Sequence, residues 1–153
     1  MTIGFGAIKD GAAITVAMMS SQVTSPTVYY NGQSITTGSG IGFDSQPFED
    51  CLCSINVGVR QGALATLINS VLESDTDNPT AATALASASF TTLSGASTAG
   101  SKETGAIKCR DTKRFLFLKS DFQGSPITIN FSAAFVGGSP REQPPSRTLV
   151  FDV

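Results

Sequence analysis

Histidine and tryptophan are both absent from the 153 residues of this chain, and charged residues make up only 14% of it. Without histidine the chain lacks the commonest general acid or base and the commonest metal ligand. Because no convergent nucleophile and base can be identified either, we expect a protein that is not an enzyme, with no catalytic, cofactor-binding or metal-binding residues. The scarcity of charge leaves a neutral polar surface, which suits packing against other protein.

Basic charge and long hydrophobic runs are also scarce. The formal net charge is -2, which argues against a dedicated nucleic-acid binder. The apolar stretch at residues 12–19 is too short to span a bilayer and lacks the basic flank of a signal peptide. We therefore expect no nucleic-acid partner, no membrane partner, and synthesis in the cytoplasm.

Cysteine is limited to Cys51, Cys53 and Cys109, an odd number in a chain too large to depend on disulfides. Cys51 and Cys53 would share one face of a strand, and Cys109 could approach from another. Structural zinc needs four ligands, and no histidine can complete this set. We expect three buried thiols.

Short apolar stretches separated by turn signals fill the chain, as is typical of a β-sandwich or barrel. They lie at residues 14–19, 27–30, 48–59, 64–72, 89–93, 106–110, 114–119, 127–136 and 148–151. An Asn-Gly pair at Asn31 and Gly32 is a hairpin signal, and Gly- and Pro-containing connectors follow at residues 38–42 and 122–126. None resembles a domain linker, so we expect an N-terminal arm at residues 1–12 and a single β-sandwich domain over residues 13–153.

In two of these stretches the side-chain pattern predicts which faces of the strand are buried. Between residues 126 and 136, Ile129 and Phe131 alternate with Asn130 and Ser132, which predicts a half-buried antiparallel strand. Residues 114–119 are apolar on both faces between basic ends, which predicts a strand covered on both sides near the middle of a sheet.

Residues 64–72 allow two interpretations. Leucine, isoleucine and valine recur there at the spacing of an amphipathic helix, but no good N-cap precedes Leu64 and the surrounding strand pattern favours a hairpin partner for residues 48–59. Alanine-rich residues 80–85 allow a helical turn after Pro79, so we expect at most a short helix near residues 80–86. Residues 95–105 are the best candidate for a mobile loop.

Three segments could carry chemistry, and each has a simpler interpretation. The acidic run at residues 73–78 could hold a hard cation, but it lacks EF-hand spacing and is more typical of an acidic turn. The basic concentration Lys108, Arg110, Lys113, Arg114 and Lys119 could stack bases around Phe115 and Phe117, but the positions alternate faces and favour structural or protein contacts. The glycine-rich residues 38–42 and 95–102 lack the order of a phosphate-binding loop.

Several segments resemble tailed-bacteriophage capsid decoration (cement) proteins that have a jelly-roll-like β-sandwich. The matching segments are residues 57–78, with Val57-Gly58 and Leu72-Glu73-Ser74-Asp75; Gly40-Ile41-Gly42-Phe43-Asp44; Ser89-Phe90-Thr91; Lys113-Arg114-Phe115-Leu116; and residues 132–138 leading to Pro140-Arg141. The resemblance covers roughly residues 40–145. It moves our interpretation of residues 64–72 to a strand, and the expected fold is an all-β, antiparallel, jelly-roll-like sandwich.

The resemblance implies a virion protein on the outer capsid surface of a bacteriophage. Such a protein binds the major capsid protein and other copies of itself, usually as a homotrimer, and stabilises the expanded icosahedral shell. The apolar, glycine-interrupted N-terminus would supply capsid or subunit contacts through Ile3, Phe5 and Ile8. The alternative is a phage tail or baseplate β-sandwich that binds a host glycan or another tail protein, since jelly rolls also serve as lectins.

Overall fold

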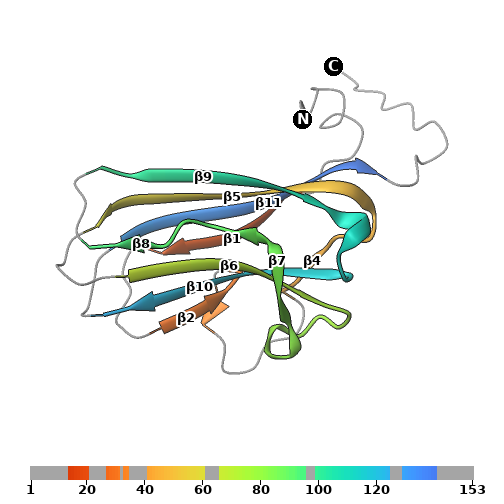
Figure 1. Cartoon of the computed structure of the whole chain (residues 1–153), viewed down its shortest axis with the longest axis horizontal. Helices are drawn as coiled ribbons and strands as arrows, with labels where there is room; N and C mark the ends of the chain where they lie inside the picture. Colours follow the sequence, from red (N-terminus) through yellow and green to blue (C-terminus); the bar gives the residue numbers. More distant parts are fainter. Residues whose placement is uncertain are drawn as a thin grey trace, which may run out of the picture.

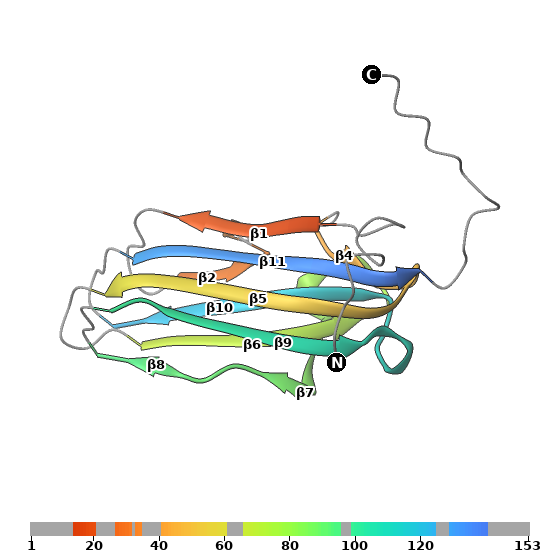
Figure 2. The ribbon, with the colours of Figure 1, turned by 90° about the horizontal axis from the view of Figure 1, so that it is seen from above.

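Two antiparallel sheets pack face to face in the computed structural model, which describes residues 14–20, 27–31, 33–34, 41–60, 66–95, 99–124 and 129–140 (Figure 1). The first sheet has the strand order β1-β11-β5-β9 and is seen face-on in Figure 2. Its strands are β1 (Ile14–Ser20), β11 (Ile129–Pro140), β5 (Phe48–Arg60) and β9 (Ser101–Lys108). The second sheet has the order β3-β2-β10-β6-β7, with β4 beside β10 and β8 beside β6. Its strands are β2 (Thr27–Tyr30), β3 (Gln33–Ser34), β4 (Phe43–Asp44), β6 (Thr66–Ser74), β7 (Thr83–Ser89), β8 (Leu93–Ser94) and β10 (Phe115–Gln123).

The strand pairs are nested along the sequence. The outermost pair is β1 with β11, followed inward by β2 with β10, β5 with β9, and β6 with β7 and β8. The first and third pairs lie in one sheet and the second and fourth in the other. A long hairpin rolled up in this way is a jelly roll, so the all-β sandwich expected from the sequence is confirmed.

The core lies between the sheets and contains two aromatic clusters. Phe43 stacks with both Phe48 and Phe135, with ring centroids 5.7 and 5.3 Å away. Phe122 meets Tyr29 and Phe131 edge-on. Aliphatic and thiol side chains complete the core: Cys51, Cys53, Ile55, Val57, Leu67, Val71, Ile107, Cys109, Leu116 and Leu118.

The burial predicted for the faces of β11 and β10 is confirmed. In β11, Phe131 and Phe135 are buried, whereas Asn130 is exposed and Ser132 is half-buried. β10 lies between β2 and β6, with Leu116 in the core and Phe117 buried on the opposite face. β10 is therefore a central strand covered on both sides.

Residues 66–74 of the ambiguous segment form strand β6, and all nine of them pair with β10. Residues 61–65 lie outside the described residues. The helical interpretation of this segment is therefore wrong.

Helical structure in the described part of the chain is limited to two short 3-10 turns, η1 (Pro79–Ala81) and η2 (Cys109–Asp111). The Asn78 side chain begins η1 by accepting the backbone N–H of Thr80 at 3.0 Å. The expected helix near residues 80–86 is thus one turn, and Thr83 already begins β7. Residues 101–105 belong to β9 instead of a mobile loop, because they pair with β5. No helix among the described residues has the length and apolarity to span a membrane.

Gly137 is required in β11 because the Phe48 ring lies directly against its backbone. A Cβ atom at Gly137 would meet three ring carbons at 2.6–2.7 Å. We expect Gly137→Ala to lower the free energy of unfolding by about 1–3 kcal/mol, since the rigid ring must move. Gly105 in β9 is the matched control, because a Cβ atom there meets nothing within 4 Å. Urea denaturation of both variants checks the prediction, and equal losses would contradict it.

Candidate interaction surface

The predicted contact residues Ile3, Phe5 and Ile8 lie outside the described residues, as does the rest of the arm at residues 1–12. Their role therefore stays a prediction. The other segments singled out in the sequence lie mostly within the described structure and can be placed.

The three cysteines form no disulfide in the described structure and are buried in the core, as expected. Cys51 and Cys53 point inward from β5, and Cys109 lies at the start of η2. A hydrogen bond with Cys109 and burial both raise the pKa of the Cys51 thiol. Burial raises the pKa of Cys53 to about 12. These thiols remain protonated at neutral pH and act as small apolar core residues.

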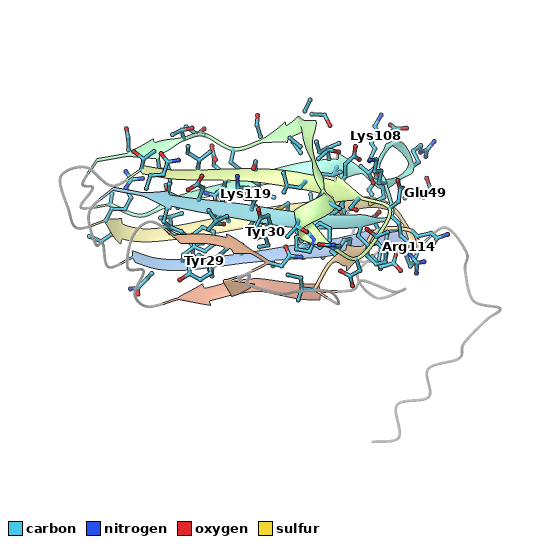
Figure 3. The ribbon with its side chains drawn as sticks, turned by 90° about the horizontal axis from the view of Figure 1, so that it is seen from below. Tyr29, Tyr30, Glu49, Lys108, Arg114 and Lys119 are labelled. Atoms are coloured by element: carbon cyan, nitrogen blue, oxygen red, sulfur yellow. The ribbon has the colours of Figure 1, made fainter. Side chains whose placement is uncertain are left out.

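Of the basic residues of the 108–119 segment, Lys108 and Arg114 lie toward one end of the molecule and Lys119 lies nearer its middle (Figure 3). Arg110 forms an ion pair with Glu49 at 2.7 Å, and the Lys113 ammonium lies 3.9 Å from the Asp75 carboxylate. Arg114 donates to the Asp44 carboxylate through two nitrogens and lies over the Phe115 ring. Lys108 and Lys119 lie on different sheets. The segment therefore does not form one basic patch.

Two carboxylates of the acidic segment hold neighbouring parts of the chain. Glu73 accepts the backbone N–H of Lys113 at 3.0 Å, and Asp77 accepts the backbone N–H of Gly42 at 2.7 Å. No group of three or more possible metal ligands occurs in the described part of the chain. The acidic segment is a turn, as expected, but its carboxylates are structural hydrogen-bond acceptors.

These contacts join three of the segments that carry the family resemblance. Residues 40–44, 72–75 and 113–116 are linked by Asp44 with Arg114 and by Glu73 with Lys113. Gly42 and Asp77 close over Phe117, because a Cβ atom at Gly42 would lie 2.8 Å from the Asp77 carboxylate and 3.0 Å from the Phe117 ring. We call residues 41–42 and 75–79 the cover loops. These three segments therefore form one structural unit at the end of the second sheet.

The ion pair of Asp44 with Arg114 gives the fold a small acid sensitivity. The hydrogen bond from Arg114 holds the pKa of the Asp44 carboxyl below its ordinary value of 3.8. A carboxyl with a lowered folded pKa stabilises the fold above its unfolded pKa, and this contribution is lost as pH falls through the folded pKa. We expect Asp44→Asn to lower the free energy of unfolding by less than about 1 kcal/mol at neutral pH. At a pH well below the folded pKa of Asp44, we expect the variant to be as stable as the wild type. Denaturant titrations at both pH values check this, and an equal loss at both would contradict it.

The outer face of the first sheet is nearly free of charge in its middle rows. One row joins Val136, Leu52 and Ala106, and the next joins Ala134, Ser54 and Thr104. The hydroxyls of Ser54 and Thr104 are 3.0 Å apart. Charged side chains begin only in the flanking rows, which contain Asp50, Lys108 and Lys102. We call these six residues of the two middle rows the small-residue face.

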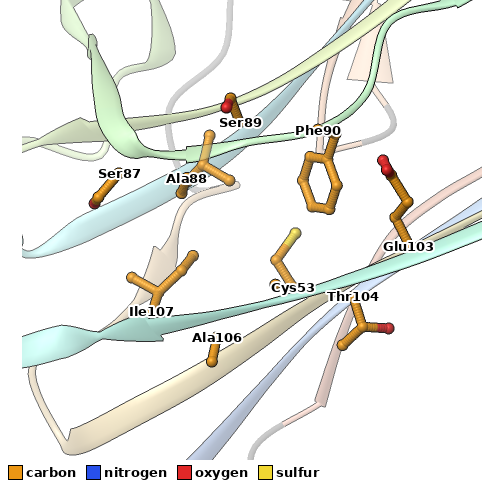
Figure 4. Close-up of a pocket in the computed structure, with 11 residues that line it drawn as sticks. Cys53, Ser87, Ala88, Ser89, Phe90, Glu103, Thr104, Ala106 and Ile107 are labelled. Atoms are coloured by element: carbon orange, nitrogen blue, oxygen red, sulfur yellow. The ribbon is translucent and has the colours of Figure 1, made fainter.

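A second uncharged region lies along the side of the sandwich where β9 is the edge strand of the first sheet and β7 is the edge strand of the second (Figure 2). From Asn78 to Ser101 the sequence contains no charged residue, and this segment forms η1, β7 and β8. Between β7 and β9 lies a pocket of about 190 Å³. Cys53 and Ile107 enter it from the first sheet, and Ala88 and Phe90 enter it from the other side (Figure 4). Glu103 bounds the pocket and accepts the backbone N–H of Thr91 at 2.9 Å.

Neither region was identified as a candidate site from the sequence. The pocket combines residues of β5, β6, β7 and β9, which only the sheet order brings together. The signal that could have pointed to it is the charge-free stretch from residue 78 to residue 101, because exposed strands at a sheet edge usually carry charge.

No family model, curated protein or solved structure matches this chain.

Proposed function

We propose that this protein is a structural protein of a tailed bacteriophage. It binds the outside of the icosahedral capsid as a homotrimer and bridges neighbouring major capsid proteins. The observation that carries the proposal is the uncharged small-residue face on a sandwich of two sheets. The resemblance of the segments around the cover loops to capsid decoration proteins supports it.

The small-residue face suits a broad contact with a protein shell. Leu52, Val136 and Ala106 provide apolar area, and Ser54 and Thr104 provide hydroxyls that can share hydrogen bonds with a partner. Protein interfaces are depleted of charge at their centre and polar at the rim, and the flanking rows with Asp50, Lys108 and Lys102 have this arrangement. The fold alone does not carry the proposal, because jelly rolls serve many functions.

The mechanism requires binding and no reaction. A protein that binds only the expanded shell shifts the shell equilibrium toward that state, by about 2.7 kcal/mol per site when its free concentration is 100 times its Kd. Repeating the contact around the shell multiplies this effect. Apolar residues of the N-terminal arm, Ile3, Phe5 and Ile8, add contacts to the capsid or to a neighbouring subunit.

The direct test is co-sedimentation of the purified chain with expanded and unexpanded shells of the phage that encodes it. We expect binding to expanded shells and about 100-fold weaker binding for Ala106→Glu, which places a charge inside the interface. Ser70→Glu is the matched control, because Ser70 faces outward from the second sheet. Equal binding to both shell forms, or no loss for Ala106→Glu, would contradict the proposal.

The arm is tested in the same assay by removing residues 2–8. We expect reduced occupancy of the shell while the folded domain keeps its unfolding free energy. Unchanged occupancy would remove Ile3, Phe5 and Ile8 from the interface.

A further inference from the structure

Within the described residues, the sandwich has an open side, where β9 is the edge strand of the first sheet and β7 is the edge strand of the second. The pocket of about 190 Å³ lies there, between these two strands. Its volume exceeds the roughly 150 Å³ of a protein cavity that binds benzene. The pocket is therefore large enough for one aromatic ring.

The pocket exists because Gly105 has no side chain. Side chains at alternate positions of a strand share one face, so Glu103, Gly105 and Ile107 of β9 all face inward. A Cβ atom at Gly105 would meet nothing within 4 Å. On the opposite side, Ala88 provides only a methyl group (Figure 4). The space over Gly105 is thus bounded by Glu103 at one end and by Ile107 at the other.

The body of the pocket is apolar. Its lining includes Cys53, Val71, Ala88, Phe90 and Ile107. The Cys53 sulfur points toward the Phe90 ring, and Ile107 faces Ala88 (Figure 4). Such a lining favours an apolar group over a charged one, and the Phe90 ring can pack against a second aromatic ring.

Glu103 is the one charged residue that lines the pocket. One of its carboxylate oxygens accepts the backbone N–H of Thr91 at 2.9 Å, and the other accepts the Thr91 hydroxyl. A carboxylate offers about four acceptor positions, so positions remain for a ligand. Glu103 forms no ion pair within the described part of the chain, and Lys102 lies on the outer face of the same strand. The carboxylate is therefore fixed in place but lacks a cation beside it.

We propose that the pocket binds a small organic amine, with an aromatic ring over Gly105 and a protonated amino group on the Glu103 carboxylate. One methylene group between ring and nitrogen suits the spacing, because neighbouring inward positions of a strand are roughly 6.7 Å apart. Benzylamine has this arrangement. The two hydrogen bonds from Thr91 orient the carboxylate before the ligand arrives, which lowers the cost of binding. The inference concerns a small ligand and does not rest on capsid binding.

A matched set of ligands tests the proposal on the full-length chain at neutral pH. Titrations followed by amide chemical shifts give the Kd of each ligand. For benzylamine we expect saturable binding with a Kd on the order of 1 mM, with the largest shift changes at Gly105 and Thr91. Benzyl alcohol has the same shape without the charge, and methylamine has the charge without the ring. We expect both to bind at least about 10-fold more weakly.

Three results of these titrations would overturn the proposal. The first is no saturable binding of benzylamine. The second is equal affinity for benzylamine and benzyl alcohol, because the carboxylate would then recognise no cation. The third is equal affinity for benzylamine and methylamine, because the ring would then lie outside the pocket.

Glu103→Gln tests the partner of the amino group. The glutamine keeps an oxygen that can accept from Thr91 but removes the charge. We expect this variant to bind benzylamine and benzyl alcohol with equal Kd values. Asp121→Asn is the matched control, because it removes the same charge from the outer face of β10, opposite to Ser120 and Phe122, and should keep the wild-type Kd. An unchanged preference for benzylamine in Glu103→Gln would overturn the proposal.

Gly105→Leu tests the place of the ring, because its side chain fills the space over β9. A Cβ atom at this position meets open space, so we expect the variant to fold and to bind benzylamine at least about 10-fold more weakly. Affinity equal to that of the wild type would place the ring elsewhere and overturn the proposal. If this variant fails to fold, Ala88→Val narrows the pocket from the opposite side, and the same two results decide.

Discussion

Replacing Phe117 with alanine is expected to lower the free energy of unfolding by about 3–5 kcal/mol. Phe117 is fully buried although it lies on the outer face of the second sheet, away from the main core. Its cross-strand partner Leu72 is buried on the same face, and the cover loops lie above its ring. The substitution leaves a cavity beneath Gly42 and Asp77, so the loss includes both transfer free energy and unfilled volume. Urea denaturation measures it.

Phe115 provides the matched control for Phe117. It lies two residues earlier on the same face of β10 and is only half-buried. Its ring contacts the Arg114 guanidinium, whose central carbon is 4.9 Å from the ring centroid, an interaction worth about 0.5–1 kcal/mol at an exposed site. We expect Phe115→Ala to cost clearly less than Phe117→Ala. Equal costs would mean that the cover loops do not enclose a second apolar core.

Replacing Asn31 with alanine is expected to lower the free energy of unfolding by about 2–4 kcal/mol, because one buried and one partly buried backbone group lose their partners. The Asn31 amide oxygen accepts the N–H of Leu118 at 2.7 Å, and its amide nitrogen donates to the carbonyl of Ile41 at 2.6 Å. Asn31 also has a φ of 44°, a conformation that alanine adopts poorly. The side chain thus continues the β10 ladder where β2 ends and connects it to the loop before β4.

Two further variants separate these contributions. Asn31→Gly tolerates the positive φ but removes the amide, so we expect it to recover only the backbone part of the loss. Asn56→Ala, at an exposed position on β5, should change stability by no more than about 0.5 kcal/mol. Full recovery in Asn31→Gly would contradict the role assigned to the two hydrogen bonds.

Strands β10 and β11 could be predicted from the sequence because the spacing of their apolar residues matches the burial of their two faces. From Phe131 to Val136, each inward position of β11 is apolar and buried, and each outward position is half-buried. β10 is apolar on both faces because Phe117 is covered by loops instead of by a third sheet. In these strands local pattern and tertiary burial agree.

The helical pattern of residues 64–72 arises from burial on both faces of β6. Leu67 and Val71 face the core, while Ile68 and Leu72 face outward and are half-buried and buried. Asn69 lies at the inward position between Leu67 and Val71, and neither amide heteroatom has a hydrogen-bond partner within the described structure. A polar residue at that inward position and apolar residues at outward positions together produce the 3.6-residue spacing.

β7 and β9 show where tertiary pairing overrides local preference. Alanine-rich residues favour a helix, but pairing of β7 with β6 extends the second sheet. Ser101 to Gly105 have the composition of a loop, yet they pair with β5 over the length of β9. The open side and its pocket follow from these two strands, so sequence alone could not locate them. Its only trace in the sequence is the absence of charge from residue 78 to residue 101.

The number of copies per virion tests the central proposal most directly. Quantitative mass spectrometry of purified phage particles gives the ratio of this chain to the major capsid protein. A trimer bound at three-fold positions over the whole shell predicts a copy number comparable to that of the major capsid protein. A handful of copies per particle would place the protein in the tail or baseplate, and its absence from the particle would contradict a virion role altogether.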